Sequence, residues 1–433
     1  MKICMVGAGY VGLVSAACFS EFGWTITCVD KESDKIDQLR QGQLPIYEPG
    51  LDELVHRNVQ MGRLSFSTEL GTSVRAAELV LLAVGTPMRR GDGHADLSFV
   101  YQAVEELAPH LNGFTVIATK STVPVGTSRE IERRLQQLRP DADFAVCSNP
   151  EFLREGSALY DFMHPDRVLV GCDEPRAKAL MERLYNPISL RNAPVMFVSR
   201  ESAELAKYTA NAFLAMKISF INEIADLCEV VGADILQVAS AIGADRRIGE
   251  KFLHPGPGYG GSCFPKDVAA LVRTAREARS PLSLIELVQT VNSERKIAMA
   301  SRIERAAGGS LAGKTVAVLG VAFKPETDDI REAASLTLIP MLQARGATVR
   351  AYDPHARENA EPLLPGVVWC EDALGTVEGA DIAVVVTEWN EFRALKLDDL
   401  KERMRGDILV DLRNIYEPAE AHEAGFTYAS VGR

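Results

Sequence analysis

The residues best suited to chemistry lie in the stretch Pro255-Gly-Pro-Gly-Tyr-Gly-Gly-Ser-Cys263-Phe-Pro-Lys-Asp267. Its four glycines let the backbone approach a ligand closely, and Pro265 is well placed to begin a helix. A cysteine just before a helix N-terminus and beside Lys266 lies in an electropositive environment that favours the thiolate. We therefore predict that Cys263 is a nucleophile. The alternatives are a buried, inert thiol at Cys263 and an ordinary first-turn acid at Asp267.

Other polar residues are spaced as a site would require. Lys207 and Asn211 lie one turn apart on one face of a long helical pattern, although a helical lysine more often extends to solvent. Glu151 and Glu155 follow a predicted strand four residues apart and would repel each other if both were simply solvated, so they suggest a site or an exposed helix start. Thr122 follows the carboxyl end of a strand, where α/β sheets bind ligands.

The N-terminus carries a dinucleotide-binding pattern, Gly7-Ala8-Gly9-Tyr10-Val11-Gly12, between a short apolar strand and a helical segment. The glycines allow a tight turn, approach to a pyrophosphate and close helix packing, and the helix N-terminus supplies amide donors. Asp30 closes the second strand 18 residues after Gly12. A carboxylate there binds the ribose 2′-hydroxyl and repels a 2′-phosphate, so the pattern predicts NAD rather than NADP. Lys35 is either part of this site or a solvated helix residue.

The elements that position these residues alternate between apolar strands and helices. Helical periodicity follows the first strand over 11–22, and the strands are short and apolar throughout, which predicts a parallel sheet covered on both faces. We predict strands over 2–6, 25–29, 79–84, 115–118, 144–147 and 167–170.

A helical pattern over 201–231 interrupts this alternation and ends at Gly232. At about 1.5 Å per residue it would extend on the order of 45 Å, a length typical of a helix that bridges domains or packs against a partner subunit. Further helices follow to residue 305, and the strand alternation restarts after the boundary at 306–310, with strands over 315–319, 348–352, 382–386 and 408–411.

The predicted fold class is α/β, with two Rossmann-like, doubly wound parallel-sheet domains joined by a long central helix and a helical domain. We place an NAD-binding domain at 1–200, a helical domain at 201–308 and a second Rossmann-like domain at 309–433.

Composition narrows the class of protein further. The 433 residues carry a net charge of −12, which argues against a nucleic-acid or anionic-membrane binder. No apolar run approaches the roughly 18 residues of a membrane span. The first 20 residues superficially resemble a signal peptide, but cleavage would destroy the glycine pattern. The eight cysteines show neither zinc-site spacing nor C-x-x-C pairs, so we expect reduced thiols, no metal site and a cytoplasmic location.

These motifs together resemble the UDP-glucose/GDP-mannose dehydrogenase family, whose nucleotide-sugar dehydrogenases oxidise an alcohol to an acid with two NAD. The sequence around the thiol is similar to the UDP-glucose branch, although His254 stands where a lysine is common. In order, the motifs are GAGYVG (7–12), GTP (85–87), KSTVPVG (120–126), NPEFLREG (149–156), ELAKYTANAFLA (204–215), RIGEKFLHPGPGYGGSCFPKD (247–267), GVAFKPETDDIREA (320–333) and DLRNIY (411–416).

The resemblance implies oxidation of UDP-glucose to UDP-glucuronate between the two Rossmann-like domains, with two NADH formed per turnover. Cys263 traps the intermediate aldehyde as a thiohemiacetal, which is oxidised to a thioester and hydrolysed. Lys207 and Asn211 suit an oxyanion site, and Asp267 with Lys207 supplies acid/base chemistry. Glu151 and Thr122 position or activate water, with Glu151 the better base.

The resemblance also assigns binding residues. For the cofactor, beyond the glycine pattern, Asp30 and Lys35, they are Thr86, Thr122, Glu155, Lys266 and Arg331. For the UDP-sugar they are Glu151, Phe152, Leu153, Lys207, Asn211, Phe252, Leu253, Tyr259, Gly260, Phe323, Lys324 and Arg413. Arg247 would reach the site of a neighbouring subunit, although from the sequence alone it is equally a solvated loop charge. By the same resemblance the long helix would form the core of a homodimer, so that 201–308 is the dimerisation domain, and 309–433 would bind the UDP-sugar.

Two alternatives remain open at this point. The same chemistry could act on another nucleotide hexose, such as GDP-mannose or UDP-N-acetylmannosamine. A non-catalytic NAD and UDP-sugar sensor is the other possibility, and the complete set of thiol, lysine and carboxylates argues against it.

Overall fold

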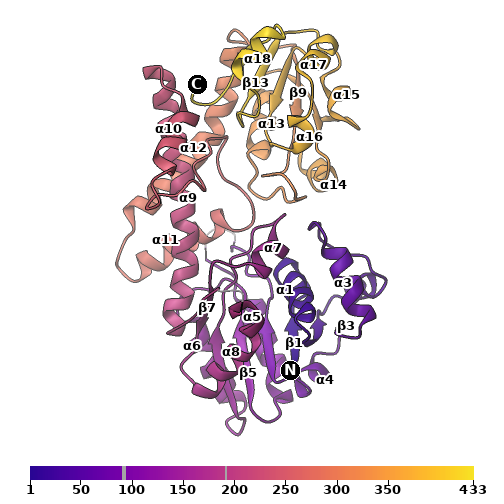
Figure 1. Cartoon of the computed structure of the whole chain (residues 1–433), viewed down its shortest axis with the longest axis vertical. Coiled ribbons are helices and arrows are strands. Elements are labelled where there is room, and N and C mark those ends of the chain that lie inside the picture. Colours follow the sequence, from indigo (N-terminus) through magenta and orange to yellow (C-terminus); the bar gives the residue numbers. More distant parts are fainter. Residues whose placement is uncertain (90–93, 191–192) are drawn as a thin grey trace. The chain divides into compact units, whose positions relative to one another are not determined.

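The computed structural model describes residues 1–89, 94–190 and 193–433, and the chain divides into two compact units (Figure 1). Unit 1 comprises Met1–Ala210 and Ala269–Ser280, and unit 2 comprises Asn211–Val268 and Pro281–Arg433. Within the described ranges, no helix combines the length and apolar character that crossing a membrane requires.

Unit 1 is built on an eight-stranded sheet in the order β3-β2-β1-β4-β5-β6-β7-β8. Strands such as β4, whose four residues are all buried, carry apolar side chains on both faces, as a sheet covered on both sides requires. The strands are β1 (Lys2–Val6), β2 (Thr25–Val29), β3 (Leu64–Ser67), β4 (Leu79–Leu82), β5 (Thr115–Thr119), β6 (Phe144–Ser148), β7 (Val168–Gly171) and β8 (Val195–Val198).

One pairing in this sheet differs from the parallel arrangement that the sequence predicted. Strand β7 runs antiparallel to β6, with Ser148 opposite Gly171, so the sheet is mixed. The helix between them, α7 (Ala158–Met163), has six residues. At about 1.5 Å per residue it is about 9 Å long, shorter than a strand of roughly 17 Å, so it is not the full-length crossover helix that usually joins parallel strands. Strand β7 therefore begins at the same end of the sheet at which β6 stops.

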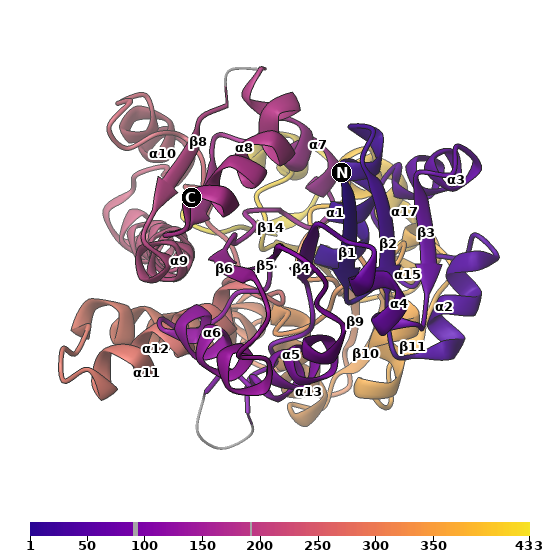
Figure 2. The ribbon, with the colours of Figure 1, turned by 90° about the horizontal axis from the view of Figure 1, so that it is seen from below.

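Helices cover both faces of the first sheet. One face packs against α1, α2, α3, α7 and α8, and the other against α4, α5 and α6. In Figure 2, α1, α7 and α8 lie above the row of strands and α5 and α6 below it. Their bounds are α1 (Tyr10–Glu21), α2 (Ser33–Arg40), α3 (Leu51–Gln60), α4 (Leu70–Arg75), α5 (Ser98–Leu107), the 3₁₀ turn η1 (Ala108–His110), α6 (Thr127–Leu138) and α8 (Pro175–Ser189).

Unit 2 contains a six-stranded sheet in the order β11-β10-β9-β12-β13-β14, with every pair parallel. Its strands are β9 (Thr315–Leu319), β10 (Thr348–Tyr352), β11 (Val368–Trp369), β12 (Ile382–Val385), β13 (Ile408–Asp411) and β14 (Thr427–Ala429). Its helices and turns are α13 (Ala334–Ala344), α14 (Arg357–Ala360), η2 (Glu361–Leu363), α15 (Ala373–Val377), α16 (Asn390–Arg393), α17 (Leu397–Arg403) and α18 (Pro418–Glu423).

The predicted long helix is present as α9 (Arg200–Val231), and its 32 residues begin in unit 1 and continue into unit 2. It is followed by α10 (Ile235–Gly243), α11 (Phe264–Glu277) and α12 (Ser283–Ala306). The predicted architecture of two Rossmann-like sheets and a long central helix is therefore confirmed.

Candidate functional site

The turn between β1 and α1 has the geometry of a pyrophosphate cradle. Gly7 has φ +106°, and a Cβ there would lie 2.6 Å from the carbonyl oxygen of Ala83. A Cβ at Gly12 would lie 1.9 Å from the carbonyl oxygen of Gly7, so both glycines are required by packing. A Cβ at Gly9 would meet nothing within 4 Å. Gly9 therefore leaves open space at the N-terminus of α1, where a dinucleotide phosphate fits.

Asp30 closes β2 beside this turn. Its Oδ2 atom accepts a hydrogen bond from the amide of Ala8 at 2.9 Å, and the ammonium of Lys35 lies 3.4 Å from the same oxygen. Lys35 also pairs with Glu32 at 3.1 Å. The carboxylate is thus fixed next to the glycine turn, as a ribose-binding acid must be.

Glu48 binds residues beside the glycine turn and was not predicted as a site residue from the sequence. This buried carboxylate accepts hydrogen bonds from the amides of Gly156 at 2.6 Å and Ala158 at 2.7 Å, and also from the Tyr10 hydroxyl. Burial, the hydrogen bond to Glu48 and the nearby charge of Glu155 raise the pKa of Tyr10. Because Glu48 is 108 residues from Gly156, no local pattern could reveal this contact.

The loop after β5 carries Thr122 at its tip. The hydroxyl of Thr86, four residues after the end of β4, donates to the carbonyl oxygen of Thr122 at 3.0 Å. Both predicted cofactor residues therefore meet at the carboxyl ends of neighbouring strands.

Glu151 and Lys207 form a buried ion pair in unit 1. The Lys207 ammonium lies 3.2 Å from Glu151 Oε1, and both side chains are buried. Glu151 also accepts from the Leu153 amide, which closes a tight loop after β6. The ammonium lies 5.1 Å from the ring centroid of Phe152, so two predicted substrate residues, Glu151 and Phe152, lie beside it. Lys207 therefore does not extend to solvent.

Lys120 is a second buried lysine near this pair, and it was not predicted as a site residue. Its ammonium lies 3.3 Å from the Tyr185 hydroxyl and 3.5 Å from Asn149 Oδ1. Burial lowers the pKa of Lys120 to about 8, with the charge of Glu151 opposing this shift and that of Lys207 reinforcing it.

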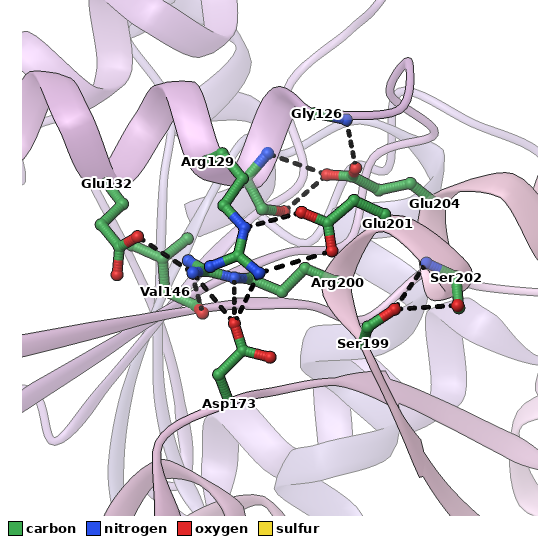
Figure 3. Close-up of polar contacts among 11 residues, drawn as sticks. Gly126, Arg129, Glu132, Val146, Asp173, Ser199, Arg200, Glu201, Ser202 and Glu204 are labelled. Carbon is green, nitrogen blue, oxygen red and sulfur yellow. Dashed lines mark hydrogen bonds and ion pairs between the residues drawn. The ribbon is translucent and has the colours of Figure 1, made fainter.

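Glu204 lies on α9 one turn before Lys207. It joins this helix to the loop after β5, and Figure 3 shows its bond with Gly126. This buried carboxylate accepts from the Gly126 amide at 2.7 Å, the Ser128 amide at 2.8 Å and the Ser128 hydroxyl at 2.7 Å. Three bonds to one carboxylate hold the start of α6 against α9. The segment bearing Thr122 and the helix bearing Lys207 are therefore fastened together.

Cys263 lies directly before α11, as predicted, and is half-buried. Its carbonyl oxygen accepts the amide of Asp267 at 2.9 Å in the first turn, and its sulfur lies 3.4 Å from the Ser262 hydroxyl oxygen. Asp267 is fully buried between two donors, with Asn211 Nδ2 at 2.6 Å from one oxygen and Lys266 Nζ at 2.6 Å from the other. The structure thus gathers a thiol, a carboxylate, an amide and an ammonium around one helix start.

The loop before Cys263 is pinned by α12. Asn292 accepts from the Tyr259 amide at 2.8 Å and donates to the Tyr259 carbonyl oxygen at 3.0 Å. Leu253 and the Tyr259 side chain are buried, and the Phe252 and Tyr259 rings lie 6.0 and 6.1 Å from the Phe264 ring. Asn292 was missed because nothing in its own sequence neighbourhood marks it.

The same loop packs on the segment that follows β9 in the second Rossmann-like domain. Gly261 has φ +82°, and a Cβ there would lie 2.7 Å from the Phe323 ring, while one at Gly260 would lie 2.4 Å from the Glu332 carbonyl oxygen. Arg413 donates to the Phe323 carbonyl oxygen at 3.0 Å. The Lys324 ammonium lies 5.4 Å from the Phe323 ring centroid. Predicted residues from 260 to 413 are therefore brought together within unit 2.

Two predicted site residues lie at the surface. Arg247 is exposed and pairs with Asp245 at 2.6 Å, and Arg331 pairs with Asp329 at 2.7 Å while its carbonyl oxygen accepts from the Gly261 amide. In the part of the chain that the structure describes, no three His, Cys, Asp or Glu side chains are grouped to hold a metal ion.

Comparison with known proteins agrees with this geometry. The chain matches the UDP-glucose/GDP-mannose dehydrogenase family over its NAD binding domain (residues 1–189), central domain (201–294) and UDP binding domain (317–418). It is 55% identical over 435 residues to a UDP-glucose 6-dehydrogenase of Rhizobium meliloti (strain 1021), with both chains covered completely. It is 45% identical to UDP-glucose 6-dehydrogenase TuaD of Bacillus subtilis (strain 168), covering all of this chain and 93% of that one.

A solved structure shares the whole fold. The UDP-glucose dehydrogenase from the hyperthermophilic archaeon Pyrobaculum islandicum superposes with a TM-score of 0.92 at 36% identity, covering 100% of this chain and 97% of that one. Full-length identity, three matched domains and the predicted motifs all agree, and the chain therefore belongs to the UDP-glucose/GDP-mannose dehydrogenase family.

Proposed function

We propose that this protein is an NAD-dependent dehydrogenase that oxidises UDP-glucose to UDP-glucuronate and forms two NADH per turnover. The observation that carries this function is the helix start at α11, where Cys263 precedes a fully buried Asp267 held by Asn211 and Lys266. Full-length relatives at 55% and 45% identity both carry the name UDP-glucose 6-dehydrogenase.

We assign Cys263 as the nucleophile of a four-electron oxidation. Bound NAD accepts the hydride that each oxidation releases. The thiolate adds to the C6 aldehyde to form a thiohemiacetal, whose oxidation leaves a thioester. Water then attacks the thioester carbonyl, the carbon–sulfur bond breaks, the product carboxylate is released and the free thiol is restored. Covalent capture keeps the reactive aldehyde on the enzyme between the two oxidations.

The surrounding polar residues are assigned to charge and proton handling. Lys207 and Asn211, one turn apart on α9, stabilise the oxygen that becomes alkoxide-like in each intermediate. Asp267 and Lys207 exchange the substrate hydroxyl proton, and Glu151 with Thr122 positions and deprotonates the hydrolytic water. The ion pair between Lys207 and Glu151 supports this assignment because it keeps a base and a cation together in a water-poor environment.

For NAD we assign residues around the β1–α1 turn of unit 1 together with the helix start at α11. Asp30 holds the ribose hydroxyl, and the amides near Gly9 hold the pyrophosphate. The full set is Gly7, Gly9, Tyr10, Val11, Gly12, Asp30, Lys35, Thr86, Thr122, Glu155, Lys266 and Arg331.

For the UDP-sugar we assign the loop before Cys263 and the residues packed on it. The contacts of Gly261 with the Phe323 ring and of Arg413 with the Phe323 carbonyl oxygen support this. The full set is Glu151, Phe152, Leu153, Lys207, Asn211, Phe252, Leu253, Tyr259, Gly260, Phe323, Lys324 and Arg413, with Arg247 serving a neighbouring subunit. We retain the domain limits 1–200, 201–308 and 309–433 for NAD binding, dimerisation and UDP-sugar binding.

A homodimer through α9 is part of the proposal. Leu205, Phe213, Phe220 and Leu227 recur at spacings of 8, 7 and 7 residues, so they form one stripe along the helix, and each is 44–55% exposed. We expect F220E and L227E to convert a dimer into a monomer in light scattering after gel filtration. L363E, which changes an exposed leucine away from α9, serves as the control and should leave the dimer intact. Dimers persisting in both α9 variants would contradict this interface.

We propose the cytoplasm as the location, since all eight cysteines are free thiols and reducing compartments maintain thiols.

The decisive experiment is a panel of UDP-glucose, UDP-N-acetylmannosamine and GDP-mannose, each incubated with NAD while NADH is measured against sugar consumed. Two NADH per UDP-glucose are expected. If GDP-mannose were oxidised and UDP-glucose were not, the assignment of UDP-glucose as the substrate would be wrong. Tight binding of UDP-glucose and NAD with no NADH formed would favour a sensor.

A further inference from the structure

Cys147 and Cys172 face each other across the antiparallel pair β6–β7. The two strands join at Ser148 and Gly171. In antiparallel register, the residue before Ser148 lies opposite the residue after Gly171, so Cys147 lies opposite Cys172. Directly opposed residues have Cα atoms about 4.5–5.5 Å apart. This separation falls inside the range of about 4.4–6.8 Å that a disulfide spans.

The two thiols are also close enough to shift each other's pKa, and both pack on the same face of the first sheet. Cys147 is buried whereas Cys172 is half-buried, and Cys172 donates in addition to the Glu174 carbonyl oxygen at 3.4 Å. A small oxidant can therefore reach Cys172 first, with Cys147 already beside it.

Arg200 clamps the two segments that carry these cysteines (Figure 3). Its guanidinium donates to the carbonyl oxygen of Val146 at 3.5 Å and to the carboxylate of Asp173 at 3.1 Å, the neighbours of Cys147 and Cys172. The interaction with Cys147 lowers the pKa of Cys172, and the Arg200 charge adds to this, while burial and Asp173 oppose it. The same thiol–thiol interaction and burial raise the pKa of Cys147. Cys172 is thus the member of the pair that reacts as a thiolate.

We propose that Cys147 and Cys172 are a reversible oxidation site that a peroxide converts into an intramolecular disulfide. The Cys172 thiolate attacks one peroxide oxygen, the O–O bond breaks, and after protonation a sulfenic acid and water are formed. The Cys147 sulfur then attacks the Cys172 sulfur, the S–O bond breaks, and a second water leaves with the Cys147 proton. Two thiols are oxidised by two electrons and one peroxide is reduced. This site is independent of the function proposed for Cys263.

Cys4 and Cys28 provide an internal comparison. They lie on the neighbouring strands β1 and β2, but Cys4 is opposite Thr27 and Cys28 opposite Met5. This offset of one residue turns their side chains to opposite faces of the sheet, and both are buried. Two cysteines on neighbouring strands therefore do not necessarily form a pair that can be oxidised to a disulfide, and Cys4 and Cys28 are expected to stay reduced.

In the test, the full-length C263S protein, which lacks the thiol of the proposed nucleophile, is treated with hydrogen peroxide. Remaining thiols are alkylated, and the tryptic peptides are mapped without reduction by mass spectrometry. The expected product links the peptide containing Cys147 to Val168–Arg176 with loss of two hydrogen atoms, and dithiothreitol releases it. C172A should abolish the link and leave Cys147 reduced, whereas C370A, which removes another half-buried thiol, should form it as fast as the parent.

Two results would overturn the proposal. One is the absence of a link between Cys147 and Cys172 in the folded parent protein, whether Cys172 stays reduced or is oxidised to sulfinic acid. The other is a link between other cysteines that forms as readily. Circular dichroism of each variant before treatment establishes that it is folded, so the absence of a link in a folded parent protein counts against the site.

Discussion

The ammonium of Lys207 lies 3.2 Å from a carboxylate oxygen of Glu151, and both side chains are buried. The two residues come from α9 and from the loop after β6, 56 positions apart in the chain. A buried pair of this kind is costly to break, because removal of one charge leaves the other unpaired. We connect it to hydrolysis of the proposed thioester, since a base held by a cation in a water-poor environment can hold and activate a single water.

E151Q should therefore slow the last chemical step. We expect kcat to fall by about 10²- to 10⁴-fold, the usual contribution of a general base. Because thioester formation is spared, intact-mass measurement during turnover should show an adduct on the protein. The same experiment in E151Q/C263S should show none. A slow E151Q enzyme that accumulates no adduct would remove Glu151 from the hydrolytic step.

C263S should retain binding of NAD and UDP-glucose while net oxidation to the acid falls by on the order of 10³-fold or more. Serine lacks the nucleophilicity that captures the aldehyde. C370S is the matched control, since Cys370 is also half-buried and should be replaceable without loss of rate. Calorimetric titration and NADH release measure the two quantities. Unchanged formation of two NADH in C263S would eliminate the covalent scheme.

D30N should separate the two roles of the Asp30 side chain, which are to support the glycine turn and to select the cofactor by its charge. Asparagine still accepts the Ala8 amide, so the glycine turn keeps its shape, but the negative charge is lost. We expect the KM for NAD to rise about tenfold and kcat/KM for NADP to rise by a similar factor, since charge-assisted bonds are worth about 1.5–3 kcal/mol. D34N, in the first turn of α2, should change neither. An unaltered preference for NAD in D30N would show that Asp30 does not select the cofactor.

E204Q should weaken the attachment of the Thr122 loop to α9. A glutamine cannot accept from three donors with one oxygen, so at least one of the bonds from Gly126 and Ser128 is lost. We expect about 1.5–3 kcal/mol lower stability and a roughly tenfold lower kcat, which corresponds to about 1.4 kcal/mol in the transition state. E201Q removes a more exposed pair with Arg129 one turn earlier and should leave kcat unchanged. Lower stability with normal kcat in E204Q would restrict Glu204 to a structural role.

Because burial lowers the pKa of Lys120, we expect its contribution to the free energy of unfolding to depend on pH. Burial lowers its pKa from 10.5 to about 8 in the folded protein, so between these values the unfolded chain binds more protons. Stability rises with pH wherever that is true, so the Lys120 contribution should increase from pH 8 to 10.5. The unfolding free energy of the wild type minus that of K120M should grow by up to roughly 3 kcal/mol across this window. Urea titrations at its two ends measure the difference, and a constant difference would contradict the shift.

Much of the site was predictable because its residues are neighbours in the chain. The glycine pattern with Asp30 and the stretch ending in Cys263 and Asp267 each lie within one short segment of the sequence. Residue type and spacing are therefore sufficient to predict both parts of the site. The same holds for Lys207 and Asn211, whose common face follows from helical periodicity. The apolar strands and the long helix were predicted on the same local grounds.

Tertiary structure alone decided how distant groups satisfy one another. Glu48 binds amides 108 and 110 residues away, Glu204 binds donors 76 and 78 residues away, and Asn292 holds a loop 33 residues before it. A buried carboxylate or amide must find a partner, but its own neighbours in sequence do not say which one. The reversal of β7 against β6, and with it the facing of Cys147 and Cys172, likewise arises from the path of the folded chain and not from any property of either strand.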